Sequence, residues 1–179
     1  MSANGSSAPA LQRVAVLGPP GSGKSTLARQ LGERYGLPVF HLDQLYFGPG
    51  WVPVEPDAFR AEVERIAALS AWVIDGNYTA TIAPRLATAD TVIYLDVPTW
   101  LAMARIARRT IASYGHERPE MAAGCPERFE PEFLRFALSW NRTRRARSLA
   151  IAEGFARRGI VLRSWRPIRD LSRILDSDP

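Results

Sequence analysis

The chain has 179 residues, a net charge of +5 and a single cysteine, Cys125. This length is typical of one domain, and one cysteine excludes an internal disulfide. No apolar run approaches the ~20 residues that cross a bilayer, and the small polar residues 1–10 do not resemble a signal peptide, so we expect a cytoplasmic protein. Residues 1–10 are predicted to be a disordered tail and residues 11–179 a single domain.

A phosphate-binding loop is the first motif in chain order. Residues 13–17 predict a short buried strand, and residues 26–35 carry apolar side chains at helical spacing. The run between them is Gly18-Pro19-Pro20-Gly21-Ser22-Gly23-Lys24-Ser25, which matches G-x-x-x-x-G-K-[ST] at every fixed position. Strand, glycine-rich loop and helix are the order that this motif requires, because phosphates bind at a helix N-terminus. Lys24 is also the only lysine in the chain.

The motif predicts nucleotide binding with Mg²⁺. Backbone N–H groups of the loop would bind phosphate oxygens, Lys24 would reach the β- and γ-phosphates, and the Ser25 hydroxyl would bind Mg²⁺. ATP is the expected nucleotide, and the motif does not separate it from GTP. The residues expected to bind it are Gly18, Pro19, Pro20, Gly21, Ser22, Gly23, Lys24, Ser25 and Thr26.

Strands and helices alternate along the rest of the chain. Strand patterns cover residues 37–42, 71–75, 91–96 and 159–163, and helical patterns cover residues 58–69, 79–86, 98–113, 132–154 and 167–175. This alternation predicts an α/β fold of three layers, in which a five-stranded parallel sheet lies between helices. Ligands of such sheets bind at the carboxyl ends of the strands. We therefore expect one crevice around the residues found there, which are Gly18, Asp43, Asp75 and Asp96.

The strand-end acids are candidates for metal binding and catalysis. Asp75 is the expected Mg²⁺ ligand, acting through water beside the loop serine, and Asp96 is the alternative because its local sequence is alike. Asp43 would orient a hydroxyl acceptor or take its proton. Tyr46 and the aromatic residues after it would line the acceptor pocket or pack this loop onto the core. His41 is expected to be structural, since no second histidine or acid lies near it at metal-ligand spacing.

Arginines cluster at residues 105–109 and 142–147. Arginine forks stabilise the charge that spreads over a transferring phosphoryl group, and Arg109, Arg142 and Arg145 are the candidates for this role. The second cluster would also suit the backbone of a nucleic acid, which is the alternative partner.

Two segments are expected to close over the ligands. Residues 44–69 form the predicted acceptor flap, and residues 114–131, rich in proline and glycine, form the predicted lid. Cys125 lies in the lid without nearby metal partners, so we expect it to be neither a ligand nor a catalyst.

Four runs of the sequence resemble the adenylate-kinase-related P-loop kinases and, within them, the group of DNA topology modulation proteins. They are the loop run continued through Thr26-Leu27-Ala28, His41-Leu42-Asp43-Gln44-Leu45-Tyr46, Trp72-Val73-Ile74-Asp75-Gly76-Asn77-Tyr78, and Gly124-Cys125-Pro126-Glu127-Arg128-Phe129. The resemblance covers residues 12–175 and implies a P-loop NTPase fold of the nucleoside monophosphate kinase type with a short lid. It also implies that Arg105 lies over the adenine, that Arg109 touches phosphates, and that Asp75-Gly76 matches the strand-end acid of adenylate kinases.

The chain departs from true adenylate kinases after this acid. They continue with Phe-Pro-Arg, whereas this chain has Asn77-Tyr78-Thr79, and a Pro84-Arg85 pair comes later. The residues expected to bind the acceptor are Asp43, Tyr46, Asp75, Asn77, Tyr78 and Arg85. The expected function is transfer of the γ-phosphoryl group of ATP–Mg²⁺ to a nucleotide or nucleoside-like small molecule. The alternative is a nucleotide-dependent, nucleic-acid-binding protein of the topology modulation type. Neither the acceptor nor the oligomeric state follows from the sequence.

Overall fold

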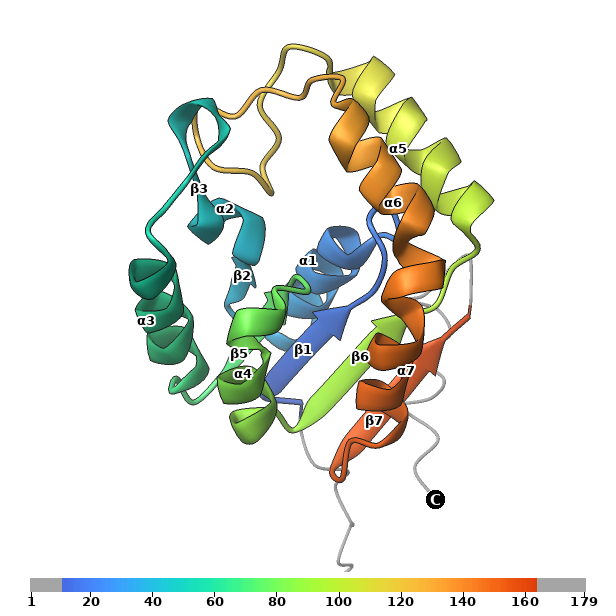
Figure 1. The fold of residues 1–179 in the computed structure, drawn as a ribbon. Helices are drawn as coiled ribbons and strands as arrows, with labels where there is room; N and C mark the ends of the chain where they lie inside the picture. Colours follow the sequence, from blue (N-terminus) through green and yellow to red (C-terminus); the bar gives the residue numbers. More distant parts are fainter. Residues whose placement is uncertain (1–10, 164–179) are drawn as a thin grey trace, which may run out of the picture.

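A computed structural model describes residues 11–163, and its centre is a sheet of five parallel strands (Figure 1). The strands are β1 (Arg13–Leu17), β2 (Val39–His41), β5 (Trp72–Asp75), β6 (Thr91–Leu95) and β7 (Arg158–Leu162), and they lie side by side in the order β2-β5-β1-β6-β7. Parallel register joins every neighbouring pair. The predicted α/β fold with a five-stranded parallel sheet is confirmed. The predicted tail over 1–10 and the predicted helix over 167–175 lie outside the described residues.

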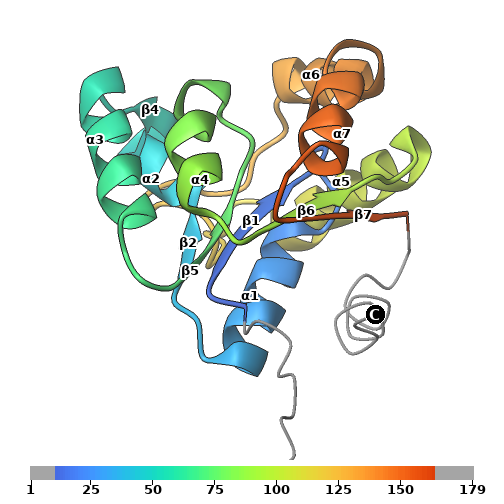
Figure 2. The same ribbon diagram turned by 90° about the horizontal axis from the view of Figure 1, so that it is seen from below.

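Helices cover both faces of the sheet (Figure 2). Helix α1 (Lys24–Tyr35) packs on one face, where Leu27 and Leu31 are fully buried against β1 and its neighbours. The other face is covered by α3 (Pro56–Ala67), α4 (Ile82–Thr88) and α7 (Arg145–Glu153). Because the central strands are enclosed on both sides, they are buried residue after residue instead of alternately, as in β5 and β6.

The flap segment begins with a short helix in place of the predicted strand end. Strand β2 stops at His41, and Asp43 lies in the first turn of α2 (Leu42–Tyr46), because Leu42 turns inward and is 1% exposed. A small antiparallel hairpin of β3 (Phe47–Gly48) and β4 (Val52–Pro53) follows, closed by the 3₁₀ turn Pro49–Trp51, and then α3. A second 3₁₀ turn, Thr79–Thr81, precedes α4.

Two helices project beyond the carboxyl ends of the strands and carry the lid segment between them (Figure 1). They are α5 (Thr99–Ser113) and α6 (Pro131–Thr143), which pack against each other. The sequence pattern predicted one helix over 132–154, and this is wrong: α6 and α7 are separate. The break falls at Arg144, where the backbone takes φ −129° and ψ −24°. No helix within residues 11–163 is long and apolar enough to cross a membrane.

Candidate active site

A cavity of about 1530 Å³ opens at the carboxyl ends of β1 and β5. Pockets for one small molecule typically hold ~300–1,000 Å³, so this cavity has room for more than one ligand. Its walls come from the phosphate-binding loop, the segment after β5, α2, α5, the lid, α6 and α7. Of the four residues expected around one crevice, Asp43 and Asp75 line this cavity, whereas Gly18 and Asp96 do not.

The phosphate-binding loop takes a shape that glycine alone permits. Gly21 has φ +74°, and a Cβ atom there would lie 2.4 Å from the backbone oxygen of Ala102 in α5. Gly18 and Gly23 also have positive φ values, and Gly23 directly precedes the first residue of α1. The positive end of the helix dipole therefore points into the loop, where a phosphate group would be stabilised.

Lys24 lies in the cavity wall with its ammonium group inside the loop. Its Nζ atom donates a hydrogen bond to the carbonyl oxygen of Pro19 at 3.0 Å. Burial lowers the pKa of Lys24, while the charges of Asp75 and Asp43 act in the opposite direction. A bound phosphate would add negative charge at this place and favour the charged ammonium further.

Asp75 and Ser25 both line the cavity beside Lys24. The Asp75 carboxylate is 4% exposed, and its Oδ1 atom lies 2.8 Å from Nδ1 of His41. Burial acts to lower the pKa of His41, but the hydrogen bond and charge of Asp75 outweigh it, so the pKa is raised. Sequence reasoning gave His41 a structural role and did not find this partner. A serine hydroxyl and an aspartate are oxygen donors of the kind that Mg²⁺ prefers beside phosphates, so these residues fit the ion.

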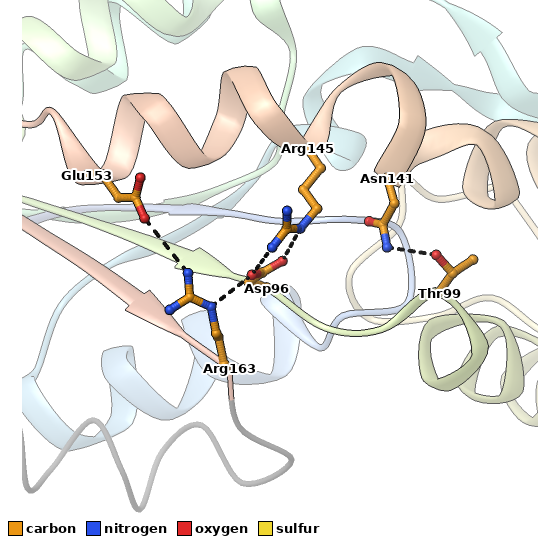
Figure 3. Close-up of polar contacts among 6 residues, drawn as sticks. All are labelled: Asp96, Thr99, Asn141, Arg145, Glu153 and Arg163. Atoms are coloured by element: carbon orange, nitrogen blue, oxygen red, sulfur yellow. Dashed lines mark hydrogen bonds and ion pairs between the residues drawn. The ribbon is translucent and has the colours of Figure 1, made fainter.

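Asp96, the alternative metal ligand, lies outside the cavity in a network of arginines (Figure 3). Arg145 donates from Nε to Oδ1 and from Nη2 to Oδ2, each at 2.7 Å, and Nε of Arg163 donates to Oδ2 at 3.2 Å. The hydrogen bond from Arg145 lowers the pKa of Asp96 against the effect of burial. Both carboxylate oxygens are occupied, so the structure favours Asp75 over Asp96 for the metal.

The predicted catalytic roles of two arginines are corrected by their positions in the structure. Arg145 is held on Asp96 and does not line the cavity, and Arg142 is exposed on α6, also away from the cavity. The arginines that do line it are Arg144 and Arg147. The error comes from the helix break, because a continuous helix would have placed Arg142 and Arg145 on one face.

We expect Asp96→Asn to reduce the free energy of unfolding at neutral pH by about 1–2 kcal/mol, because it removes a charged fork whose arginine is partly exposed. The folded-state pKa of Asp96 is depressed, so its stabilisation is present above the unfolded pKa and is lost as the pH falls through the folded pKa. Urea unfolding at pH 7 and in acid measures this: the gap between wild type and variant should shrink in acid. The control is Asp57→Asn, at an exposed carboxylate near Arg60. A gap that does not depend on pH would contradict the charged pair.

The segment after β5 brings some predicted acceptor residues to the cavity and removes others. Asp43, Asp75, Asn77 and Tyr78 line the cavity, whereas Tyr46 and Arg85 do not. The Tyr46 ring packs edge-on against Phe59 at 5.2 Å and lies 4.8 Å from the Tyr78 ring. Tyr46 therefore packs the flap onto the core, which was the other interpretation of its sequence.

Arg85 does not contact the cavity, which corrects its predicted role in acceptor binding. Its side chain is 0% exposed and donates to four backbone carbonyl groups, those of Thr81, Gly76, Asn77 and Tyr78, at 2.9–3.2 Å. Burial lowers the pKa of its guanidinium to about 10, so the buried charge persists at neutral pH. The guanidinium holds the backbone of the segment that carries Asn77 and Tyr78.

Helix α5 supplies two arginines to the cavity wall. Nη1 of Arg105 donates to the carbonyl oxygen of Ser22 at 2.8 Å, which fixes the arginine against the phosphate-binding loop. Arg109 lies deeper, and burial lowers its pKa. Arg105 and Arg109 both line the cavity. Their expected contacts with adenine and phosphates remain predictions.

The lid and the flap meet across the mouth of the cavity. The backbone N–H of Gly50 donates to the carbonyl of Gly124 at 2.7 Å, Nε1 of Trp51 donates to Pro126 O at 3.0 Å, and Sγ of Cys125 donates to Gly48 O at 3.1 Å. Cys125 is thus a buried packing residue of this junction. Both segments contribute residues to the cavity lining.

Sequence reasoning missed the buried Glu127, which organises the lid. Its carboxylate is 5% exposed and accepts from Thr110 at 2.9 Å and from Arg109 at 3.4 Å. Nε of Arg118 lies 2.6 Å from its second oxygen. Glu127 pairs with one arginine from α5 and one from the lid. Such a pairing leaves no local signal in the sequence.

Aromatic residues of α6 form a further part of the cavity that the sequence did not predict. Phe133, Phe136 and Trp140 line it from one helix face. The Arg144 guanidinium lies 5.2 Å from the Phe136 ring centre, within the range of a cation–π contact. The spacing of three and four residues indicates that these rings share one helix face. The same spacing is equally typical of a helix that faces the core, so it did not identify the cavity lining.

Sequence similarity links the chain to named kinases. It is 30% identical to a shikimate kinase of Rhodococcus jostii over 142 residues, which cover 69% of this chain and 78% of that protein. It is 28% identical to a cytidylate kinase of Desulfurococcus amylolyticus over 113 residues, which cover 54% of this chain and 60% of that protein. No protein-family model matches the chain.

Solved structures of kinases share the fold. A gluconokinase from Sinorhizobium meliloti has a TM-score of 0.56 at 18% identity, covering 93% of this chain and 90% of that one. A shikimate kinase from Acinetobacter baumannii, in complex with shikimate, has a TM-score of 0.56 at 21% identity, covering 92% and 90%. The fold and the sequence relatives define a P-loop kinase, and the chain belongs to the P-loop kinases of the nucleoside monophosphate kinase type. ATP-dependent phosphoryl transfer to a small acceptor is its class of reaction.

Proposed function

We propose that this kinase transfers the γ-phosphoryl group of ATP–Mg²⁺ to a small acceptor that carries an anionic group beside a flat or apolar part. The observation that supports this most directly is the continuity of the cavity. One space joins the phosphate-binding loop to a lobe lined by Arg144, Arg147 and the aromatic face of α6. ATP phosphates at the loop and an anion at the arginines would lie in the same cavity.

On the nucleotide side, each residue has a defined role. Lys24 and the loop N–H groups bind the β- and γ-phosphates, and Arg105 and Arg109 face them from α5. Mg²⁺ would be held by the Ser25 hydroxyl and, through water, by Asp75, and when bound it neutralises charge on the phosphates. His41 holds one oxygen of Asp75 in place at 2.8 Å.

On the acceptor side, Asp43 handles the attacking oxygen. Its Oδ1 atom accepts a hydrogen bond from the hydroxyl of Tyr78 at 2.7 Å. Burial and the charge of Asp43 raise the pKa of Tyr78, so this hydroxyl stays a donor. With a hydroxyl acceptor, the acceptor oxygen forms a bond to the γ-phosphorus, the bond to the β–γ bridging oxygen breaks, and the proton passes to Asp43.

The relatives differ in their acceptors, so their names define a test panel and not an answer. They are a shikimate kinase, a cytidylate kinase and a gluconokinase. A nucleotide or nucleoside-like acceptor suits the rings of α6, which offer flat surfaces for stacking. The kinship with the DNA topology modulation group rests on the four runs quoted above and stays a proposal.

A nucleic-acid partner has less support than a small acceptor. That alternative depended on residues 142–147 as a basic surface. In the structure Arg145 is paired with Asp96, and Arg144 and Arg147 line the cavity. The cluster is divided between an ion-pair network, the cavity and the surface, so it does not form one basic stripe.

We expect Arg144→Ala and Arg147→Ala each to lower kcat/KM for the acceptor about tenfold to a hundredfold, because each removes charge-assisted hydrogen bonds to an anion. Initial rates of ADP formation would be measured with ATP–Mg²⁺ and each of shikimate, gluconate, cytidine monophosphate and uncharged nucleosides. The matched control is Arg142→Ala, two residues from Arg144 but outside the cavity. Equal losses in all three variants, or preference for an uncharged nucleoside, would contradict an anionic acceptor held by these arginines.

A further inference from the structure

The buried side chain of Arg85 fixes the backbone of residues 76–78. Arg85 donates to the carbonyl oxygens of Gly76 at 2.9 Å, of Asn77 at 3.2 Å and of Tyr78 at 3.2 Å. A buried guanidinium must satisfy its donors, and here the backbone carbonyls do so. The carbonyls of this segment therefore point toward Arg85, away from the cavity that its side chains line.

The Asn77 side chain is paired with the backbone of the phosphate-binding loop. The N–H of Gly18 donates to Oδ1 of Asn77 at 3.2 Å, and Nδ2 of Asn77 donates to the carbonyl oxygen of Gly18 at 2.8 Å. Gly18 is the first glycine of the loop, has φ +150°, and a Cβ atom there would lie 2.9 Å from Leu95 O. A single amide thus satisfies both polar groups of the residue where β1 turns into the loop.

The next residue contacts another side chain that lines the cavity. The Tyr78 hydroxyl donates to Oδ1 of Asp43 at 2.7 Å, and Asp43 comes from α2 at the start of the flap. Neighbouring side chains of one rigid segment therefore hold the start of the phosphate-binding loop and the acceptor-side carboxylate.

From these contacts we propose that Asn77 is a positioning residue for the phosphate-binding loop. Arg85 sets Asn77 in place through the backbone of residues 76–78. This segment thereby couples the nucleotide side of the cavity to Asp43. The inference rests on the proposed function, because it concerns binding of ATP at that loop. It assigns Asn77 and Arg85 to positioning in place of direct contact with the acceptor.

Isothermal titration calorimetry with the non-hydrolysable nucleotide AMP-PNP and Mg²⁺ tests this on the full chain. We expect Asn77→Ala to raise Kd about tenfold, because two hydrogen bonds that hold the loop are lost. The matched control is Asn141→Ala, which removes a side-chain hydrogen bond of similar length, 2.7 Å to Thr99, that does not involve the loop (Figure 3). It should leave Kd unchanged. Arg85→Lys should also raise Kd, although Arg85 does not line the cavity.

Two further readouts separate positioning from general loss of structure. The melting temperature of Asn77→Ala should stay near that of Asn141→Ala, and the amide resonance of Gly18 should shift in Asn77→Ala and not in the control. Full AMP-PNP affinity in Asn77→Ala, with affinity lost in Lys24→Ala, would overturn the inference and leave the kinase proposal standing. Absence of AMP-PNP binding in the wild type would overturn both. Because Asn77 alone decides these outcomes, a failure of Arg85→Lys to fold does not obscure them.

Discussion

Replacing Lys24 by alanine is expected to lower the rate of phosphoryl transfer about a hundredfold to a thousandfold, the typical effect of deleting one preorganised donor to developing charge. The Nζ atom lies inside the phosphate-binding loop, bonded to Pro19 O at 3.0 Å. It is the only lysine in the chain, and an arginine, whose guanidinium is a planar fork, does not replace its compact point charge. Coupled measurement of ADP formation with the best acceptor of the panel gives the rate.

The loss should occur without unfolding. Lys24 is the first residue of α1, and alanine is the best helix former at that position. Circular dichroism and thermal melting should therefore match the wild type closely. The control is Glu33→Ala, at an exposed residue on the same helix that forms a surface ion pair with Arg29 at 3.9 Å. A rate in Lys24→Ala within a few fold of the wild type would show that the loop does not hold the transferring phosphates.

Replacing Glu127 by alanine is expected to open the lid. The closed lid should lose about 3–5 kcal/mol of stability, because a buried charge is left without its partner. The carboxylate lies between Arg118, at 2.6 Å, and Arg109, at 3.4 Å. The charge of Arg118 already lowers the pKa of Arg109, in addition to the effect of burial, so the two guanidinium groups repel each other. Without Glu127 the two guanidinium groups lose the carboxylate that lies between them.

Hydrogen exchange measures the opening directly. The N–H of Gly115 donates to Glu127 O at 2.9 Å and the N–H of Glu127 donates to His116 O at 2.9 Å, so both amides should exchange much faster in Glu127→Ala. Exchange in β1 and β6 should stay slow. Glu62→Ala is the contrast, because Glu62 pairs with Arg65 on the surface at 2.7 Å and its loss should leave the lid unaffected. Unchanged protection of Gly115 in Glu127→Ala would show that backbone contacts alone close the lid.

The fold was predictable because its signals are local. The apolar strands, the glycine loop between β1 and α1, and the helical spacing after it each lie within about ten residues, and the alternation of elements leaves few topologies. The helix over 132–154 was the exception. Its break falls at Arg144, next to Arg145, which pairs with Asp96 49 residues away in the sequence, and a periodic pattern does not contain that contact.

The site divides in the same way. The phosphate-binding loop is one continuous run, so its residues could be named directly from the motif. The proposed acceptor side is assembled from α2, the segment after β5, the lid and α6, and which side chain reaches the cavity depends on how these elements pack. Arg85 shows the difficulty. From the sequence it was predicted to bind the acceptor, and only the structure shows that its donors bind backbone carbonyl groups.

The measurement that tests the kinase function most directly is ³¹P nuclear magnetic resonance of ATP–Mg²⁺ with the wild-type protein and each acceptor of the panel. A kinase with this site should convert the γ-phosphate resonance into ADP and one new phosphorylated product, with one anionic acceptor far ahead of the rest. Product should form about a hundredfold to a thousandfold more slowly in Lys24→Ala. Release of inorganic phosphate alone, at a rate that no acceptor changes, would contradict phosphoryl transfer as the function of this cavity.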